Sequence, residues 1–356
     1  MSASTLDAKR PKLDNEGAAA SSSSAGIVTH SGTFHADEAL AVNLLRTLPQ
    51  FKPLSLTRTR DPELISQGAI VVDVGAEYDQ SRNRFDHHQR GFEEVFDQKH
   101  KTKLSSAGLV WKHYGQAILS QHLSLPLEDA RVTLLWNKLY DDFIEAIDGI
   151  DNGIPQYPSS ATSAYKNKTD LSSRVGYLNP SWNQTATSQE MDVRFERASS
   201  MAGGEFFDRV DYTFSAWLPA REIVERAMSR RAELSGDAQG RVLVFDEFAS
   251  WKDHLFTLEA EQAADASGKG HTPAERILYV VYPDEAGKWR IQAVPETADS
   301  FVSRKALPEA WRGVRDAQLD ELTGIPGGIF VHASGFIGGH QTREGALKMT
   351  QKALEF

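Results

Sequence analysis

The stretch "GIVTHSGTFHADEALAVNLLRTL" (residues 26–48) decides the fold, because a short apolar run leads directly into a helical pattern. The run Ile27–Thr29 predicts a short buried strand, and residues 37–48 repeat apolar side chains at helical spacing. A second strand, "GAIVVDVG" (68–75), is bounded by glycines. Strands that alternate with helices are typical of a parallel sheet covered on both faces. We therefore predict an α/β fold.

The composition and strand patterns of the whole chain predict a tail followed by two domains. Residues 1–25 are rich in Ser and Ala without apolar periodicity, which indicates a disordered tail. Residues 26–190 form the expected parallel-sheet domain, which ends in a lid-like loop rich in Ser, Thr, Asn and Pro. Residues 191–356 contain the strand patterns "RVLVFDEF", "RILYVVYP" and "WRIQAVP", and they predict a smaller mixed α/β domain. A chain of 356 residues is long enough to bury two cores.

Composition excludes several classes of function. The chain has no cysteine, so disulfides, thiolate metal sites and a cysteine nucleophile are excluded. Any metal must be held by His, Asp, Glu and water. The net charge of −10 disfavours a protein that coats nucleic acid but leaves room for an enzyme that binds a few phosphates in a local positive cleft. No apolar run approaches the roughly 20 residues of a membrane-spanning helix, so we expect no membrane segment.

Acids and imidazoles follow the predicted strands of the first domain. Because ligands bind outside the carboxyl ends of parallel strands, chain-distant segments would bring these side chains to one place. Oxygen and nitrogen ligands in such number can hold two divalent cations bridged by a shared carboxylate, which activates a water and clamps phosphoryl oxygens. The candidates are His30, His35, Asp37, Asp73, Asp86, His87, His88, Asp148 and Asp151.

Each candidate taken alone also has an ordinary structural explanation. A lone Asp after a strand usually caps a helix or forms a turn, and a lone His is mostly a surface residue or a hydrogen-bonded core residue. The motifs His-x-Asp, strand-Asp-x-Gly and Asp-His-His nevertheless arrive in order. This repetition favours a metal site over independent structural roles.

The order of these motifs resembles the DHH-type phosphoesterase superfamily and, more closely, the melanocyte-proliferating-gene family of exonucleases. The resemblance covers most of residues 27–350 and leaves out the N-terminal tail. It implies a two-domain fold with the metals in the first domain. The segments that carry it are "THSGTFHADEALA", "VVDVGAEYD", "FDHHQRGF", "TKLSSAGLVW", "AIDGIDNGI" and "FVHASGFIGGHQTREGAL".

Carried over by position, the resemblance implies two ligand sets that share one residue. His30, His35 and Asp73 would hold one metal. The other metal would be held by Asp37, Asp73, His87 and one aspartate of the segment "AIDGIDNGI", the fourth motif, so that Asp73 is the bridge.

The resemblance also assigns the remaining candidates of the first domain. His88 would face the substrate phosphate, and Asp86 would orient the imidazoles from behind. In the fourth motif, the turn that begins at Asp151 resembles the family's Asp-Thr turn, so we prefer Asp151, with Asp148 as the alternative.

One departure from the superfamily concerns the metal. The superfamily commonly has Asp-x-Asp in its first motif, whereas this chain has His35-Ala36-Asp37. An imidazole in place of a carboxylate lowers the negative charge by one and shifts preference toward manganese or zinc. We therefore expect two divalent cations, with Mn²⁺ favoured and Mg²⁺ or Zn²⁺ as alternatives.

The C-terminal "GFIGGHQTREGA" resembles the glycine-rich, His-containing motif with which a DHH-associated second domain grips substrate. Gly338 and Gly339 would let backbone N–H groups approach a phosphate closely. His340 and Arg343 would supply charge-assisted contacts. A second basic group at Arg304 and Lys305 is either a further phosphate site or a solvated face, and the sequence weighs these two interpretations equally.

The favoured function is a divalent-metal-dependent phosphodiesterase that acts as a 3′–5′ exoribonuclease and releases mononucleotides. Its polarity and its preference for RNA or short oligonucleotides come from the resemblance alone. The alternatives are a small-nucleotide phosphodiesterase or pyrophosphatase, and a non-catalytic regulatory scaffold. The fragment "KRPK" (9–12) fits a minimal nuclear import signal. With the family resemblance, it indicates nucleus or cytoplasm, mitochondria being an alternative, and a homodimer stays open.

Overall fold

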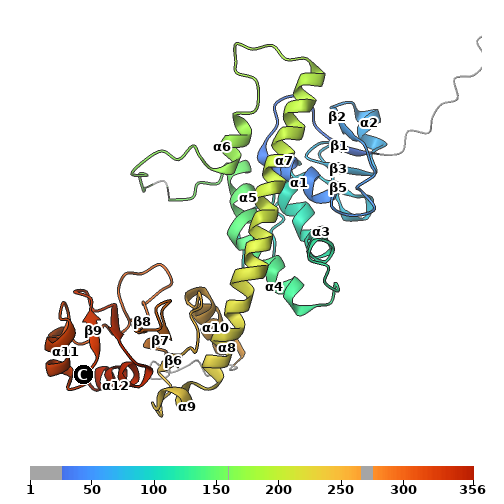
Figure 1. The fold of residues 1–356 in the computed structure, drawn as a ribbon. Coiled ribbons are helices and arrows are strands. Elements are labelled where there is room, and N and C mark those ends of the chain that lie inside the picture. Colours follow the sequence, from blue (N-terminus) through green and yellow to red (C-terminus); the bar gives the residue numbers. More distant parts are fainter. Residues whose placement is uncertain (1–25, 159, 266–275) are drawn as a thin grey trace, which may run out of the picture. The chain divides into compact units, whose positions relative to one another are not determined.

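A computed structural model describes residues 26–158, 160–265 and 276–356 (Figure 1). The expected disordered tail and its basic cluster at 9–12 lie outside the described residues. The chain divides into two compact units, one ending at Val210 and one comprising Asp211–Phe356.

The first unit contains a five-stranded sheet in the order β2-β1-β3-β5-β4. The strands β2, β1, β3 and β5 are parallel, and only the edge strand β4 runs antiparallel to its neighbour β5. The central strands β1 and β3 are fully buried, as their apolar sequences predict. Their bounds are β1 (Ile27–Thr29), β2 (Leu56–Arg58), β3 (Ile70–Val72), β4 (Tyr78–Asp79) and β5 (Arg84–Phe85).

Helices pack around this sheet, and α1 is buried along nearly its whole length. It begins directly after the loop that follows β1, and it packs against α3 and α5. The helical elements are α1 (Ala36–Leu45), α2 (Pro62–Ser66), η1 (Gln80–Arg82), α3 (Ser106–Leu123), α4 (Ala130–Leu139), the π-helical η2 (Tyr140–Ile144), α5 (Glu145–Asp151) and α6 (Leu171–Gly176).

The division between the two compact units falls within a long helix. Helix α7 (Ser188–Tyr212) continues into η3 (Thr213–Trp217) and α8 (Leu218–Ser229). Most of α7 belongs to the first unit because its aromatic side chains pack there. Phe195 meets Phe34 edge-on at 5.8 Å, and Phe206 meets Trp111 at 5.1 Å. A composition change at 190 therefore precedes the division in space.

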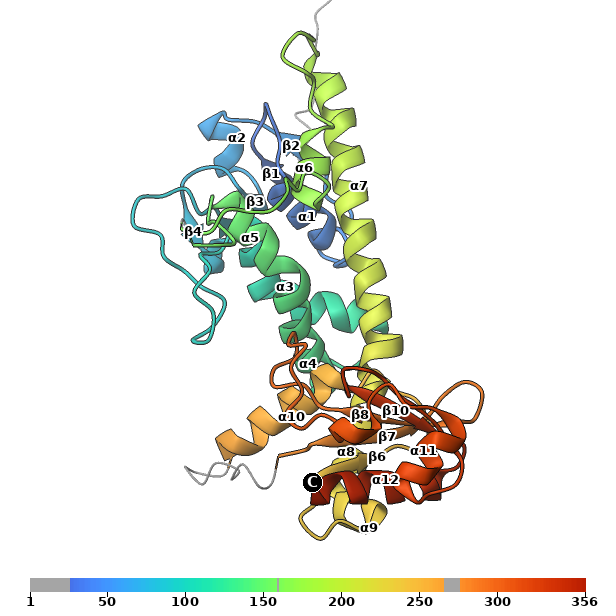
Figure 2. The same cartoon turned by 90° about the vertical axis from the view of Figure 1, so that its left-hand side faces the viewer.

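The second unit contains a mixed five-stranded sheet in the order β6-β7-β8-β10-β9 (Figure 2). Only β6 and β7 are parallel. The bounds are β6 (Val242–Val244), β7 (Tyr279–Pro283), β8 (Trp289–Ala293), β9 (Gly328–Val331) and β10 (Ile337–His340), with α9 (Arg231–Ser235), α10 (Lys252–Asp265), η5 (Glu309–Trp311), α11 (Asp316–Thr323) and α12 (Arg343–Glu355).

Alternate residues of this second sheet build two separate apolar clusters, which cover its two faces. Val281 packs in a cluster with Met349 of α12, whereas Val280 packs in another with Leu255 of α10. This arrangement confirms a mixed α/β second half.

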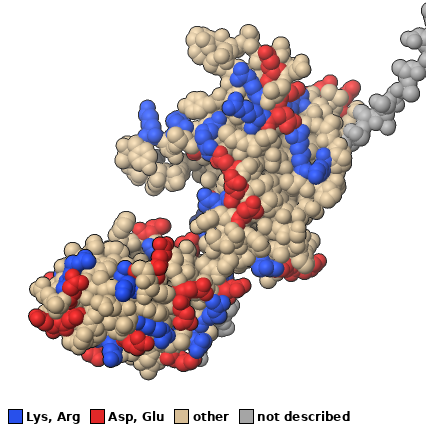
Figure 3. Space-filling view, viewed as in Figure 1, with Lys and Arg blue, Asp and Glu red and all other residues tan. Residues whose placement is uncertain are grey.

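The distribution of charge and the character of the helices bear on what the protein can bind. On the face drawn in Figure 3, Lys and Arg side chains interleave with Asp and Glu, so the net charge of −10 does not form one acidic face there. Within the described ranges, no helix has both the length and the apolar character needed to cross a membrane.

Candidate metal centre

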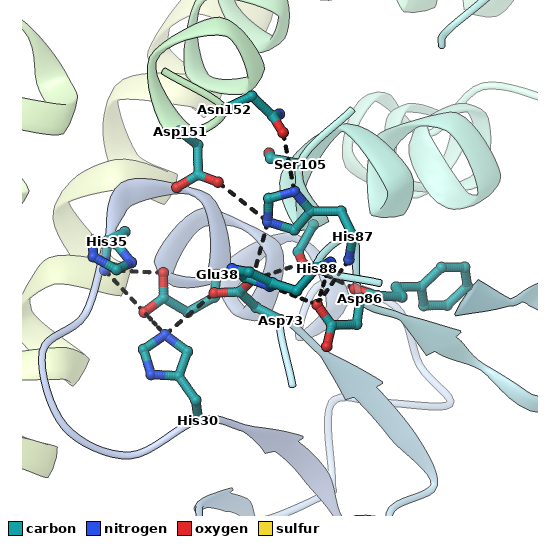
Figure 4. Close-up of polar contacts among 12 residues, drawn as sticks. His30, His35, Glu38, Asp73, Asp86, His87, His88, Ser105, Asp151 and Asn152 are labelled. Carbon is teal, nitrogen blue, oxygen red and sulfur yellow. Dashed lines mark hydrogen bonds and ion pairs between the residues drawn. The ribbon is translucent and has the colours of Figure 1, made fainter. Parts of the chain in front are cut away.

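Three strands of the first sheet deliver polar side chains to one edge (Figure 4). His30 follows β1, Asp73 follows β3, and His87 follows β5. The Asp73 carboxylate lies between the two imidazoles, 3.2 Å from Nε2 of His30 and 3.3 Å from Nε2 of His87. The parallel strands therefore bring together the residues that the sequence predicts at this edge.

Asp73 also has an unusual backbone conformation. Its φ of 57° places a non-glycine residue in the left-handed region. Such a conformation costs on the order of 1 kcal/mol and persists only where the surroundings enforce it. Strain of this kind is frequent at functional sites, and here it turns the carboxylate at the end of β3 toward the imidazoles.

Helix α1 adds Asp37, whose carboxylate is completely buried. Within the described part of the chain, neither of its oxygens has a hydrogen-bond partner. Its charged neighbours are other carboxylates, those of Asp73, Asp151 and Glu38, and together with burial they raise the pKa of Asp37 well above its ordinary value. Such a buried carboxyl is either protonated or compensated by a bound cation.

His87 is held so that one ring nitrogen faces the acids. Its Nδ1 lies 3.3 Å from the side-chain oxygen of Asn152. The Asn152 amide nitrogen donates to the carbonyls of Lys103 and Asp148, so its oxygen points to His87. In a metal-bound His87 the proton would therefore lie on Nδ1, which leaves Nε2, the nitrogen that faces the acids, to bind the metal. That Nε2 also lies 3.2 Å from Asp151.

Asp86 holds the adjacent residues His87 and His88 in place by hydrogen bonds. Its Oδ1 accepts hydrogen bonds from the backbone N–H groups of His87 and His88, at 2.8 and 3.1 Å. The same oxygen lies 2.8 Å from Nδ1 of His88, and Oδ2 accepts from the backbone of Ala76 at 2.6 Å. The His88 side chain is 62% exposed. Its Nε2 is consequently left to face solvent or a ligand.

Of the two aspartates in the fourth motif, the structure brings Asp151 and not Asp148 to the cluster. Asp148 is fully buried, and its Oδ1 accepts hydrogen bonds from the backbone and hydroxyl of Ser105 and from the backbone of Gly108. The hydroxyl of Tyr140 donates to its Oδ2. Asp148 therefore ties α5 to the start of α3.

Glu38 lies in the cluster although the sequence patterns do not single it out. It is fully buried, lies 3.1 Å from Nε2 of His30, and accepts the backbone N–H of His35 at 2.9 Å. The available signal is its place three residues after His35, the first residue outside α1. This is the spacing of a capping box, in which a Glu side chain accepts that N–H.

The neighbouring carboxylates raise the pKa of two imidazoles in the cluster. Burial by itself lowers the pKa of His30, yet Asp73 and Glu38 outweigh it and raise that pKa to about 10. Burial also opposes the charged form of His87, but Asp151 and Asp73 raise its pKa to about 10. The cluster therefore attracts positive charge strongly, in the form of protons or of metal ions.

The donor set fits divalent metal ions. Three groups have one ligand atom per residue within 4.8 Å of each other: His30, His35, Glu38 and Asp73; Asp73, His87 and His88; and His35, Asp37 and Asp151. Asp73 belongs to two of them, as a bridging ligand would. Imidazole and carboxylate donors without sulfur suit Mn²⁺, Mg²⁺ or Zn²⁺. The unpartnered carboxylate of Asp37 is the observation that supports this fit most strongly.

Two cavities open on the cluster, and His35 and His88 line both. The larger, of about 680 Å³, also contacts His30, Asp73 and Asp86. The smaller, of about 350 Å³, contacts Asp37 and Asp151 and reaches α6. A ligand passing between the two cavities would cross the cluster.

The glycine-rich motif of the second unit lies in a strand, not in an open loop. Gly338 and Gly339 belong to β10, which pairs with β8 on one side and β9 on the other. His340 is buried, its Nδ1 accepts the backbone N–H of Thr342, and its Nε2 lies 3.0 Å from the carbonyl of Pro326. These residues are engaged in packing and pairing within their own unit.

The basic side chains expected to grip substrate also have partners within this unit. Arg304 makes a two-pronged contact with Glu259, at 2.8 and 2.7 Å, and its side chain is only 3% exposed. Lys305 donates to the carbonyl of Leu354 at 3.0 Å. Arg343 lies over the ring of Trp289.

Fold and cluster define an α/β protein with a histidine–carboxylate centre at the carboxyl edge of a parallel sheet. A family described as "Uncharacterised protein family (UPF0160)", labelled MYG1_exonuc, matches residues 26–354. The chain is 47% identical to the "MYG1 protein" of Dictyostelium discoideum over 92% of this chain and 96% of that protein. It is 47% identical to the "MYG1 exonuclease" of Homo sapiens over 92% of this chain and 85% of that protein. The chain belongs to the MYG1 family.

Proposed function

We propose that this protein is a divalent-metal-dependent phosphodiesterase of the DHH type that acts as a 3′–5′ exonuclease on RNA. The observation that carries the proposal is the buried, unpartnered carboxylate of Asp37 inside a cluster of imidazoles and acids. The human, bovine, rat and mouse relatives are named exonucleases, which supports a nuclease. RNA as substrate, the 3′–5′ polarity and the release of mononucleotides rest on the family resemblance.

We divide the residues of the cluster into metal ligands and residues that support them. His30, His35, Glu38 and Asp73 would hold one cation, and Asp37, Asp73, His87 and Asp151 the other. Bound divalent cations lower the pKa of a water and neutralise charge that develops on a phosphate. We favour Mn²⁺, because His35 supplies an imidazole where the superfamily has a carboxylate.

His88 and Asp86 act on the substrate side of the cluster. Asp86 holds Nδ1 of His88 and both backbone N–H groups of the pair, so the ring cannot turn freely. The remaining nitrogen faces the two cavities that His88 lines. From there it donates a hydrogen bond to an oxygen of the substrate phosphate, where negative charge increases during hydrolysis.

The test is an RNA digestion with a matched pair of variants. Single-stranded RNA labelled at its 5′ end is incubated with Mn²⁺, Mg²⁺ or EDTA. Asp37→Asn removes the buried charge, and Asp208→Asn removes an exposed one from α7 of the same unit. We expect a ladder that shortens from the 3′ end with wild type and Asp208→Asn, and its loss in EDTA or with Asp37→Asn. Intact RNA with every metal would overturn the proposal.

A further inference from the structure

Three arginines line the larger of the two cavities beside the cluster. It is lined by the cluster residues His30, His35, Asp73, Asp86 and His88, and also by Arg60, Arg82 and Arg84. At about 680 Å³ its volume is in the range of small-molecule sites. All of its lining residues belong to the first unit.

Two of these arginines form no ion pair among the described residues. Arg82 pairs with Glu77, which also lines the cavity. Arg60 donates from Nε to the carbonyl of Ser31 at 3.1 Å, and the buried Arg84 donates to three backbone carbonyls. Among the residues that the structure describes, no carboxylate lies within ion-pair distance of either guanidinium. The cavity therefore holds two guanidinium groups without an ion-pair partner, although Asp73, Glu77 and Asp86 also line it.

Arg60 lies directly beside the cluster. Its Nη2 is 3.3 Å from Nδ1 of His30, the ring whose other nitrogen faces Glu38 and Asp73. A guanidinium without an ion-pair partner, next to a cluster that holds cations, can bind an anion that contacts both. Its fork of N–H donors matches the oxygens of a phosphate.

The cavity also offers apolar surface. Pro62, Ile65 and Val74 contribute to its lining. Nucleotide sites combine such surface, for a base or ribose, with a few fixed polar groups. A bare phosphate or pyrophosphate would leave these apolar side chains uncovered, so the lining favours a nucleoside attached to the phosphate.

We propose that Arg60, supported by Arg84, binds the phosphate of a nucleotide that occupies this cavity. The proposal rests on the proposed function and deepens it, because it names a binding residue for the nucleotide next to the bond that is cleaved. The released nucleoside monophosphate keeps the same contacts. It therefore competes with RNA for the site.

The test compares Arg60→Ala with Arg60→Lys and with Arg82→Ala, whose arginine lines the same cavity but is already paired. Calorimetry in Mn²⁺ measures the Kd of adenosine 5′-monophosphate, and steady-state digestion measures KM and kcat on RNA. Loss of a charge-assisted hydrogen bond corresponds to a change on the order of 10- to 100-fold. We expect Arg60→Ala to raise the Kd and the KM by this factor. Arg60→Lys should recover part of the loss, added guanidinium ion should restore binding to Arg60→Ala, and Arg82→Ala should stay near wild type.

The outcomes separate this inference from the proposed function. An unchanged Kd in Arg60→Ala overturns the inference even where wild type digests RNA, and so does a wild type that does not bind the nucleotide. A wild type that binds the nucleotide through Arg60 but leaves RNA intact supports the inference and overturns the exonuclease. An equal loss in Arg82→Ala contradicts a specific contact by Arg60.

Discussion

Neutralising the side chain of Asp37 should have opposite effects on the stability of the fold with and without bound metal. In EDTA, Asp37→Asn replaces a carboxyl whose charged form is disfavoured by burial and by neighbouring carboxylates, so we expect it to be at least as stable as wild type in urea unfolding. In Mn²⁺, wild type gains about 2.7 kcal/mol when the metal concentration is 100 times its Kd. Asp37→Asn should lose most of that gain. Equal destabilisation in both conditions would instead indicate a packing role.

The two aspartates of α5 should separate stability from metal binding. Asp148→Ala leaves the donors of Ser105, Gly108 and Tyr140 buried without an acceptor, so we expect a loss of about 2–4 kcal/mol in unfolding free energy. Asp151→Ala removes a partly exposed group. It should change stability little in EDTA but weaken Mn²⁺ binding by about 10- to 100-fold or more. The reverse pattern would make Asp148 the ligand.

The sequence predicts the chemistry of this site better than the role of each residue. The strands place His30, Asp73 and His87 together because each side chain follows a parallel strand. Asp148 and Asp151 are three residues apart and face the same side of a helix, so spacing alone cannot separate them. Their roles are decided by chain-distant partners, the N-terminus of α3 for Asp148 and His87 for Asp151.

At the scale of single elements, His100 links the loop before α3 to η2 by charge. Its ring nitrogens lie 2.7 Å from Asp97 and 2.8 Å from Asp141. Burial disfavours the imidazolium, but the two carboxylates outweigh it and raise the pKa of His100.

Because the pKa is higher in the folded state, protonation of His100 stabilises the fold fully below the unfolded pKa of about 6.5. The contribution is lost as pH rises through the folded pKa. We expect His100→Gln to lower the unfolding free energy by up to about 1 kcal/mol at pH 6, with a deficit that shrinks toward pH 9. Urea unfolding across this range measures it, and a deficit independent of pH would contradict the charge link.

Short apolar strands are predicted well from sequence, but the glycine-rich segment is not. "GFIGGH" has the composition of a phosphate-binding loop, yet it forms β10. Glycine is needed nearby for packing: a Cβ added to Gly345 in α12 would come within 1.8 Å of the His340 ring, and one on Gly339 in β10 within 3.0 Å of the Phe330 ring. Composition does not distinguish a glycine that approaches a ligand from one that approaches a side chain.

At the scale of the whole molecule, the two units should respond differently to metal. The centre lies entirely in the first unit, and the apolar clusters of the second sheet contain only residues of the second unit. In calorimetry we expect Mn²⁺ to raise the temperature of one unfolding transition only. Met349→Ala, which opens a cavity in the second unit, should lower the other transition. Equal shifts of both transitions by Mn²⁺ would show that the units unfold together.

The existence of two α/β units follows from length and strand patterns, but the point of division does not. A change in composition marks residue 190, whereas the division in space depends on where Phe195 and Phe206 find partners. Those partners, Phe34 and Trp111, are distant in sequence. The periodicity of α7 alone cannot reveal them.

The most direct test of the metal centre is to count bound Mn²⁺ by electron paramagnetic resonance of the free ion during titration. We predict that wild type and Asp208→Asn bind two ions per chain, and that Asp37→Asn binds fewer or binds with an affinity lowered at least about 10-fold. Equal stoichiometry and affinity in wild type and Asp37→Asn would contradict a metal centre at this cluster.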